Sequence, residues 1–132
     1  MIKAIGHLGI VVKNIETSLN ALSQILDFER PAIREFPGKK MECAVVEVNG
    51  ISLEFLQDDS EDGFLGQFVR KNGNSIHHFC LLSDNIGEDI ESLKQKGVAM
   101  MDQAPRTGLR GKKIAFIAPE ALDGIAIELS EP

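Results

Sequence analysis

The sequence predicts an α+β fold in which two βαβββ modules form one curved mixed sheet around a cleft, with the helices outside. Two self-similar stretches carry this prediction. The phrase "NGISLEFLQ" at 49–57 returns as "DGIAIELSE" at 123–131, and "HLGIVVKNIETSLNAL" at 7–22 aligns without a gap with "HFCLLSDNIGEDIESL" at 78–93. The length of 132 residues agrees with two modules that share one core, because a module of about 60 residues buries too little surface to be stable by itself.

Each half begins with a short apolar run typical of a strand and then reaches an asparagine suited to capping a helix. The cap is Asn14 in the first half and Asn85 in the second, where Glu88 completes a capping box. Apolar residues follow at helical spacing, and Gly97 is expected to end the second helix. They are Ile15, Leu19, Leu22 and Leu26 in the first half, and Ile86, Ile90 and Leu93 in the second.

After its helix, each half reads as three strands. Their approximate bounds are 30–35, 41–48 and 51–57 in the first half, and 98–102, 112–118 and 124–130 in the second. Asn49-Gly50 is a hairpin turn signal, and Asp123-Gly124 stands at the matching place behind a longer loop. A short amphipathic helix with Phe64, Leu65, Phe68 and Val69 joins the halves. We therefore expect one domain over 1–132, with modules 1–60 and 74–132 and a helical connector at 61–73.

The amino-acid composition argues against some classes of protein. With 43% hydrophobic and 26% charged residues, the chain resembles an ordinary soluble globular protein. A net charge of −6 and the absence of Trp and Tyr argue against a nucleic-acid partner, and no apolar run approaches the roughly 20 residues of a membrane span. Cys43 and Cys80 lie in apolar strand patterns and are expected to be reduced, buried thiols. Because no signal-peptide region precedes the first strand, we expect a cytoplasmic protein.

Each repeated phrase places a glutamate inside an apolar strand, which is costly unless the carboxylate is paired or bound to a metal. Strand alternation puts Glu54 and Glu128 on the face opposite the larger apolar residues of their strands. His7 and His78 occupy equivalent strand positions in the two halves. If a pseudo-twofold axis relates the halves and brings the two glutamates together, it also brings the two histidines to symmetry-related positions. His77 points away from His78 by alternation, and we interpret it as structural.

Two imidazoles and two carboxylates form a mixed nitrogen and oxygen set that suits one divalent ion, such as Zn, Ni, Co or Mn. A lone strand histidine is more often a core residue, and a lone strand glutamate often lies at a wet edge. Four candidates at repeat-equivalent positions favour the metal interpretation over both alternatives. We therefore predict a metal site formed by His7, Glu54, His78 and Glu128, which leaves two positions open on an octahedral ion.

A basic, glycine-containing loop stands out on this acidic chain. It holds Arg106, Arg110, Lys112 and Lys113 around Gly108 and Gly111. Such a loop is either a solvated surface feature or a site that steers the anionic part of a carrier. The sequence alone leaves both interpretations open.

The whole chain resembles the vicinal oxygen chelate superfamily of glyoxalases, bleomycin resistance proteins and dioxygenases. Its candidate ligands are of the kind that this superfamily uses. The stretches "FLGQFVRKNGNSIHHFCL", "APRTGLRGKKIAFIAP" and "GIAIELSE" are most similar to methylmalonyl-CoA epimerases. The resemblance implies a glyoxalase-like fold and a metal-dependent epimerase that acts by proton transfer next to a CoA thioester. The implied alternatives are a glyoxalase I (lactoylglutathione lyase) and a non-catalytic binding protein of the same fold.

The resemblance also implies the partners and roles. One divalent ion (Co, Zn, Ni or Mn) is chelated by a thioester carbonyl and a carboxylate of a small acyl-CoA substrate. Glu128 is the first candidate for an acid or base, and the second such residue is unassigned. Arg106, Lys112 and Lys113 are the candidate substrate-binding residues. A homodimer is compatible with the sequence.

The sequence departs from the family pattern in two places and leaves one residue difficult to assign. "ALSQILDF" ends the first helix where many relatives have an aromatic pair and a Val-Leu-Gly turn, and Ala118-Pro119 stands where they have His-Pro. The epimerases also tend to use a second acidic residue before the hairpin. Glu42 is near in sequence, but counting back across Asn49-Gly50 places Val45 on the face of Glu54 and Glu42 on the other.

Overall fold

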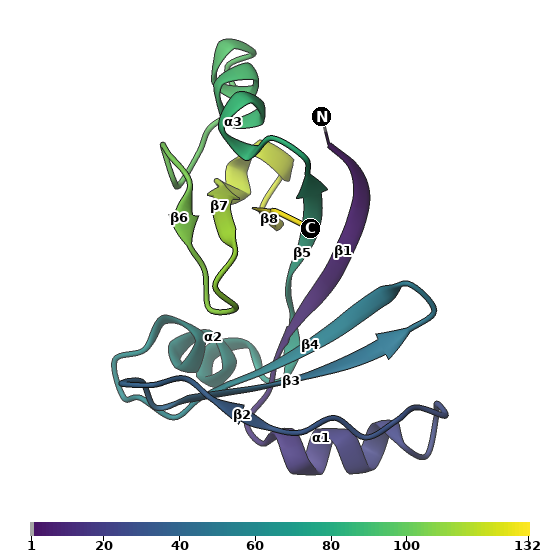
Figure 1. The fold of residues 1–132 in the computed structure, drawn as a ribbon. Coiled ribbons are helices and arrows are strands. Elements are labelled where there is room, and N and C mark those ends of the chain that lie inside the picture. Colours follow the sequence, from purple (N-terminus) through teal and green to yellow (C-terminus); the bar gives the residue numbers. More distant parts are fainter. Residues whose placement is uncertain (1) are drawn as a thin grey trace. The chain divides into compact units, whose positions relative to one another are not determined.

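The computed structural model describes residues 2–132. Figure 1 shows its elements, which in chain order are β1 (Ile2–Val11), α1 (Ile15–Leu22), β2 (Arg34–Glu35), β3 (Met41–Val48), β4 (Ile51–Asp58), α2 (Phe64–Asn72), β5 (Ser75–Ser83), α3 (Ile86–Gln95), β6 (Arg106–Thr107), β7 (Lys113–Ile117), the 3₁₀ helix η1 (Pro119–Leu122) and β8 (Ala126–Ser130). The strands have the order β2-β3-β4-β1-β5-β8-β7-β6. Because β5 and β8 are parallel while β7 and β8 are antiparallel, the predicted α+β class with a mixed sheet is confirmed.

The chain divides into two compact units, which we describe one at a time. Unit 1 comprises Met1–His7 and His78–Pro132, and unit 2 comprises Leu8–His77. The strands β1 and β5 contribute residues to both units. The division of the sequence into modules 1–60 and 74–132 describes the repeat, and it stays our proposal for how the chain is organised.

In unit 2, two helices lie on opposite sides of the β3-β4 hairpin, as Figure 1 shows. Helix α1 begins where the Asn14 side chain accepts a hydrogen bond from the Thr17 amide, as its cap role predicts. Its residues Ile15 and Leu19 pack against one face of the hairpin, where Ala44, Val46 and Phe55 are buried. Helix α2, the predicted connector, packs on the other face through Val69, against Cys43 and Leu56.

The hairpin between β3 and β4 turns at Asn49 and Gly50, whose φ angles of 48° and 95° are both positive. Two positive angles match the twist of the flanking strands, and asparagine and glycine tolerate them best. The turn sets a register in which Val45 lies opposite Glu54 and Glu42 lies opposite Gln57. The pairing is continuous over the whole hairpin, so the predicted assignment of Glu42 to the face away from Glu54 is confirmed.

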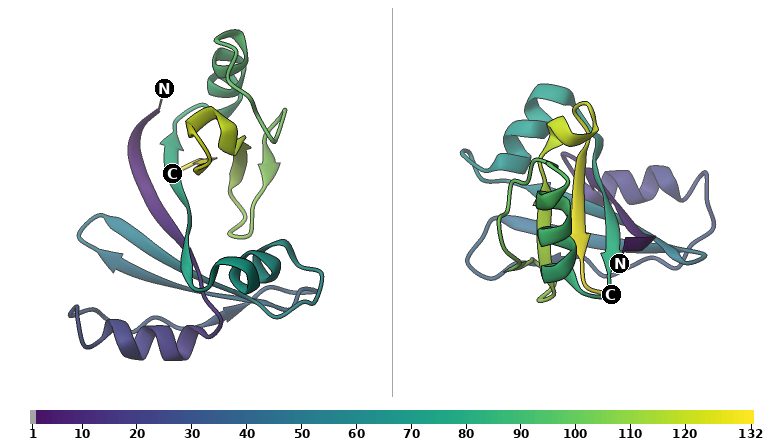
Figure 2. Two further views of the ribbon diagram at one scale, coloured as in Figure 1. Left: turned by 180° about the vertical axis from the view of Figure 1, so that it is seen from behind. Right: turned by 90° about the horizontal axis from the view of Figure 1, so that it is seen from above.

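In unit 1, helix α3 packs against β7 and β8, and the right-hand view of Figure 2 shows it running alongside these strands. The Asn85 side chain accepts the Glu88 amide at the start of α3, and Gly97, with a φ of 81°, follows its end. Ile86 and Ile90 provide the buried face of the helix. They pack against Ala115, Ile117 and Leu129. The predicted helix face is therefore confirmed.

Three predicted boundaries were wrong. Residues 98–102 form an isolated bridge between Met100 and Ile117 instead of a strand. The ladder is irregular here, because the amides of Met101 and Asp102 both donate to the Phe116 carbonyl, while the Asp102 carboxylate accepts the Phe116 amide. The short edge strand β6 lies later, in the loop. The strand predicted at 30–35 is reduced to β2, since Pro31 has no amide hydrogen to donate to a ladder. Helix α1 ends at Leu22, four residues before Leu26, because the amides of Gln24 and Ile25 donate to carbonyls three residues earlier, as in a turn.

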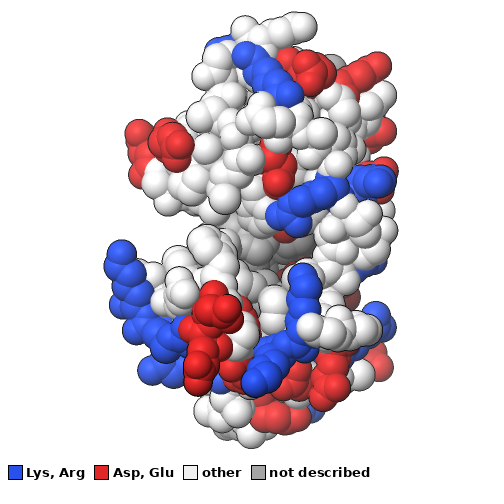
Figure 3. All heavy atoms as spheres, turned by 90° about the vertical axis from the view of Figure 1, so that its left-hand side faces the viewer, with Lys and Arg blue, Asp and Glu red and all other residues white. Residues whose placement is uncertain are grey.

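Two surface properties bear on possible partners. Within residues 2–132, no helix is long and apolar enough to cross a membrane. Basic and acidic side chains are interspersed on the face drawn in Figure 3.

Candidate metal centre

A cluster of polar side chains forms in unit 1 because β5 and β8 run parallel with a fixed register. Cys80 lies beside Glu128 in this register, and His78 lies beside Ala126. Since side chains alternate along each strand, His78, Cys80 and Glu128 share one face. His7, from β1, joins them there.

The distances within the cluster are short. His7 Nε2 lies 3.2 Å from His78 Nε2, and the two rings meet edge to face with centroids 5.3 Å apart. Oxygens of Glu128 lie 3.9 Å from His7 Nε2 and 3.5 Å from His78 Nε2. All three residues are buried, with at most 9% of any of them exposed. Two imidazole nitrogens and a carboxylate therefore converge in the interior of unit 1.

The donor atoms of this cluster fit a divalent metal ion. Nitrogen and oxygen ligands lie about 2.0–2.2 Å from such an ion, so neighbouring ligand atoms lie roughly 3–3.6 Å apart. The separations of 3.2 and 3.5 Å fall in this range, and 3.9 Å is only slightly longer. A buried carboxylate also needs a compensating positive charge, which a metal would supply. The residues thus suit the predicted cofactor, a divalent metal ion.

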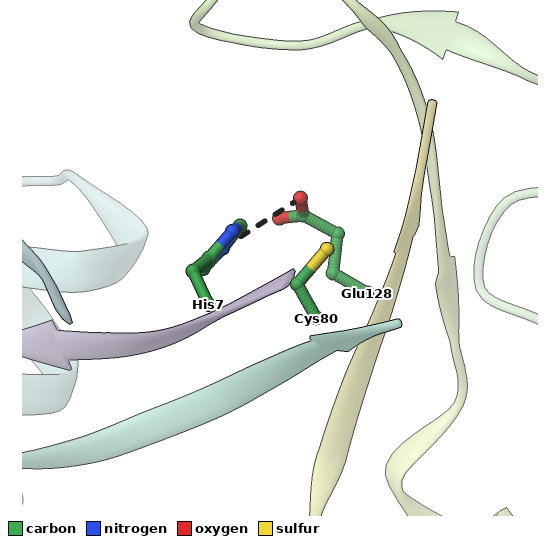
Figure 4. Close-up of side chains that lie close together, drawn as sticks. All are labelled: His7, Cys80 and Glu128. Atoms are coloured by element: carbon green, nitrogen blue, oxygen red, sulfur yellow. Dashed lines mark ion pairs between the residues drawn. The ribbon is translucent and has the colours of Figure 1, made fainter. Parts of the chain in front are cut away.

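Cys80 is the member of the cluster that sequence reasoning missed. Its Sγ, a His7 nitrogen and a Glu128 oxygen all lie within 4.8 Å of one another. Figure 4 shows the three side chains pointing toward one another from β5, β1 and β8. The sequence held a usable signal, because a residue two positions after His78 on a strand must share its face. The prediction that Cys43 and Cys80 are buried thiols is confirmed.

Glu54, the fourth predicted ligand, belongs to unit 2. It is 5% exposed and lies on β4 opposite Val45, on the face predicted from the sequence. Next along the same face, Ser52 donates a hydrogen bond of 2.7 Å to Glu47 Oε1. Glu54 is therefore a buried carboxylate on a polar stretch of its hairpin, and its role as a ligand stays a prediction.

A second feature of unit 1 extends from the cluster toward the basic loop. Phe116 lies opposite Glu128 in the β7-β8 register, and its ring packs edge to face on His78 with centroids 5.4 Å apart. The Arg106 guanidinium lies 5.8 Å from the centre of the Phe116 ring. Asp102 holds this arrangement, because one oxygen accepts Arg106 Nε at 3.1 Å and the other accepts the Phe116 amide at 2.8 Å. Arg106 is thus fixed one side chain away from His78.

The two lysines of the basic loop are placed differently from Arg106. The register pairs Arg106 with Ile114, which shares a strand face with Phe116. Lys113, one residue earlier, belongs to the face that carries Ala115 against α3. The ammonium group of Lys112 donates a hydrogen bond to the carbonyl of Pro132. Of the three predicted substrate-binding residues, Arg106 has the most direct connection to the metal-type cluster.

His77 lies in unit 2 and has the structural surroundings that its alternation predicts. Its ring contacts Phe64 and Phe68 of α2 edge to face, with centroids 5.7 and 4.8 Å apart. Burial lowers the pKa of His77, so its neutral form is favoured.

The fold and the cluster define a βαβββ-repeat protein with a histidine and carboxylate centre suited to a divalent metal. Residues 6–116 match the family described as the glyoxalase/bleomycin resistance protein/dioxygenase superfamily, and the chain belongs to this superfamily. The predicted family is thereby confirmed.

Individual proteins are also similar to this chain. An uncharacterised protein of Bacillus subtilis, YqjC, is 29% identical over 128 residues, which cover 97% of this chain and 91% of YqjC. The mitochondrial methylmalonyl-CoA epimerase of Dictyostelium discoideum is 26% identical over 130 residues, which cover 96% of this chain and 77% of the epimerase. A solved structure of methylmalonyl-CoA epimerase in complex with methylmalonyl-CoA and NH4+ superimposes with a TM-score of 0.88. It is 23% identical and covers 99% of this chain and 95% of its own.

Proposed function

We propose that this protein is a metal-dependent isomerase that interconverts the epimers of methylmalonyl-CoA by proton transfer at the carbon next to the thioester. The observation that carries the proposal is the convergence of His7, His78 and Glu128, with separations of 3.2 to 3.9 Å. The similarity to the Dictyostelium epimerase over 96% of the chain supports the choice of substrate. Glyoxalase chemistry, the alternative implied by the sequence, gains no support from the relatives named above.

The proposed metal ligands are His7, His78, Glu128 and Glu54. A bound divalent ion supplies Lewis-acid charge, which stabilises the negative charge that develops on the substrate oxygens when the proton leaves. The imidazoles provide neutral nitrogen donors, so the carboxylates are the groups that balance the ion's charge. Glu54 is assigned from the repeat and the family resemblance, whereas the other three are also supported by their mutual distances.

Glu128 is the proposed acid or base. The residue is 9% exposed and lies on the strand face that carries both Cys80 and Phe116 as neighbours. A carboxylate in such a site accepts the proton from the substrate carbon and can return it. Epimerisation also needs proton delivery to the opposite side of that carbon, and the residue that performs it is unassigned.

Arg106 is the proposed anchor for the anionic part of the substrate. Its Nε is bound to Asp102, which leaves the two terminal guanidinium nitrogens for an anion. Guanidinium groups pair with carboxylates or phosphates through two parallel hydrogen bonds. Lys112 and Lys113 stay in the proposal as further cations that steer the CoA moiety.

Isotope exchange tests the proposal directly. The metal-reconstituted protein is incubated in heavy water with methylmalonyl-CoA, and deuterium at C2 is followed by mass spectrometry together with the ratio of epimers. We expect exchange and epimerisation that stop with a chelator and return with added metal. The hemithioacetal of methylglyoxal and glutathione is tested on the same preparation. Turnover of this adduct alone would replace the proposal with glyoxalase chemistry, and inactivity on both would refute it.

Two further predictions concern the setting of this activity. A cytoplasmic location is expected for a protein whose two cysteines are thiols. A homodimer is compatible with the proposal. Fractionation of the source cells and light scattering of the purified protein test these expectations.

A further inference from the structure

Cys80 belongs to the metal-type cluster, although the proposed reaction does not use it. The residue is fully buried, at 0% exposure, and its Sγ lies within 4.8 Å of ligand atoms of His7 and Glu128. The other cysteine provides a contrast, since Cys43 packs in an apolar core cluster with Leu56 and Val69. Cys43 thus lies among apolar side chains, whereas Cys80 lies beside groups that bind metals.

We propose that Cys80 is a metal ligand, which with His7, His78 and Glu128 completes a set of four donors for thiophilic divalent ions such as Zn and Cd. The inference rests on the metal centre proposed above, but it concerns unit 1 alone. It requires no donor from unit 2, so it is independent of the role of Glu54.

The strand register favours this ligand. A zinc–sulfur bond is about 2.3 Å long, whereas bonds from nitrogen and oxygen are about 2.0–2.2 Å. A sulfur ligand therefore stands farther from the other donor atoms than a nitrogen or oxygen does. Cys80 and Glu128 are paired side by side on the parallel strands β5 and β8, so both donors lie on the same face of the sheet. His78, two residues before Cys80 on β5, shares this face.

The charges also balance. A thiolate and a carboxylate together neutralise a divalent ion, and two neutral imidazoles add no charge. This neutrality matters because every donor residue is buried, and uncompensated charge in the interior is costly. Thiolate ligands moreover select soft ions, while carboxylates and carbonyls suit harder ones such as Mn.

The kind of ion bound would decide whether the metal centre keeps a coordination position for the substrate. A tetrahedral ion bound by four protein donors has no position left for a substrate, as in structural zinc sites. A harder ion has little affinity for the thiol and would keep positions available. Cys80 would therefore make the centre sensitive to the kind of metal, with Zn and Cd held tightly in a closed form.

Cobalt spectroscopy tests the ligand without relying on activity. Co(II) is titrated into the full-length wild type, Cys80→Ala and the matched control Cys43→Ala. We expect visible cobalt bands in all three proteins. A near-ultraviolet band from thiolate-to-cobalt charge transfer should appear in the wild type and in Cys43→Ala and be absent from Cys80→Ala. In parallel, the affinity for Cd should fall at least about tenfold in Cys80→Ala, while the affinity for Mn changes by less than about twofold.

The outcomes separate this inference from the proposed metal centre. Visible bands without charge transfer in the wild type would overturn the Cys80 ligand and leave the centre standing. No cobalt bands at all would overturn both. A charge-transfer band that survives in Cys80→Ala and disappears in Cys43→Ala would also overturn the inference. If circular dichroism shows that Cys80→Ala is unfolded, Cys80→Ser, which is nearly isosteric, must lose the same band.

Discussion

Glu54 and Glu128 occupy equivalent positions of the repeat, but their surroundings differ. Both are buried, with 5% and 9% of their surface exposed. Glu54 lies on the strand face opposite α1, and Glu128 lies on the strand face opposite α3. Across the antiparallel ladder, Glu54 faces Val45 while Glu128 faces Phe116. Beside Glu128 on β5 stands Cys80, and the repeat places Gly9 of β1 at the corresponding position.

The comparison shows what a sequence repeat preserves and what it leaves free to change. The repeat preserves backbone positions, so the carboxylate is buried on the same face in both halves. The neighbours come from other strands, whose side chains have diverged. Unit 1 therefore holds an aromatic ring across the ladder from its glutamate, where the other half has a valine. It also holds a thiol at a position that the repeat aligns with a glycine.

The largest expected effect is on the rate of isotope exchange, and it separates Glu128, the proposed acid or base, from Glu54, a proposed ligand only. Glu128→Gln keeps the size of the side chain but removes the base, and we expect deuterium exchange into methylmalonyl-CoA to fall by about 10²–10⁴-fold. Glu54→Gln should lose less, because only a ligand is weakened. Exchange rates are measured at saturating metal. Equal losses in the two variants would remove the functional distinction between the halves.

A second test concerns metal binding by the histidines. We expect the affinity for divalent metal to fall by at least about 100-fold in His7→Ala, since a direct ligand is lost. His77→Ala is the matched control, because this histidine packs on Phe68 and should leave metal binding nearly unchanged. Elemental analysis after dialysis, with a competing chelator, measures both. Full occupancy in His7→Ala would refute the predicted site.

The third test separates the cations of the basic loop. Arg106→Ala should raise KM for the CoA substrate by about tenfold with little change in kcat, if its contact acts equally on ground state and transition state. Lys113→Ala removes the same charge from the strand face that meets α3, and a rise of about twofold or less is expected. Steady-state kinetics at constant ionic strength decides between them. The reverse order would show that the strand faces do not control substrate binding.

The smallest effect concerns Asp58, a buried carboxylate on β4 whose surroundings explain its burial. Burial raises the pKa of Asp58, but hydrogen bonds from Ser60 and the Gly66 amide outweigh it and hold the pKa below its usual value. We expect Asp58→Ala to lower the free energy of unfolding by about 1–3 kcal/mol at pH 7 without changing metal affinity.

The pH dependence of that difference follows from the sign of the shift. Because the folded pKa is depressed, the charged group stabilises the protein fully above its unfolded pKa of 3.8. This contribution is lost as the pH falls through the folded pKa. Urea unfolding at neutral pH and near pH 3 should therefore show a smaller difference between wild type and Asp58→Ala in acid. A difference that grows in acid would contradict this account.

The sequence by itself determined the repeat, the helix caps, the hairpin turn and the strand face of each candidate ligand. These features follow from local rules, since Asn14 and Asn85 satisfy helix amides and Asn49 and Gly50 accept positive φ. Alternation along a strand then fixes which side chains share a face, as it did for Glu54 and Glu42.

Only the tertiary structure decided which residues of distant segments meet. Cys80 came beside Glu128 because β5 and β8 pair in parallel in one register, and a shift of one residue would have separated them. The same is true of Phe116, which lies between His78 and Arg106 through the β7-β8 register. The absence of a regular strand at 98–102 also follows from a tertiary contact, because the Asp102 carboxylate accepts a hydrogen bond from the Phe116 amide that a neighbouring strand would have accepted. A local pattern can show that Cys80 shares a face with His78, but which strand lies beside that face is set by packing between segments.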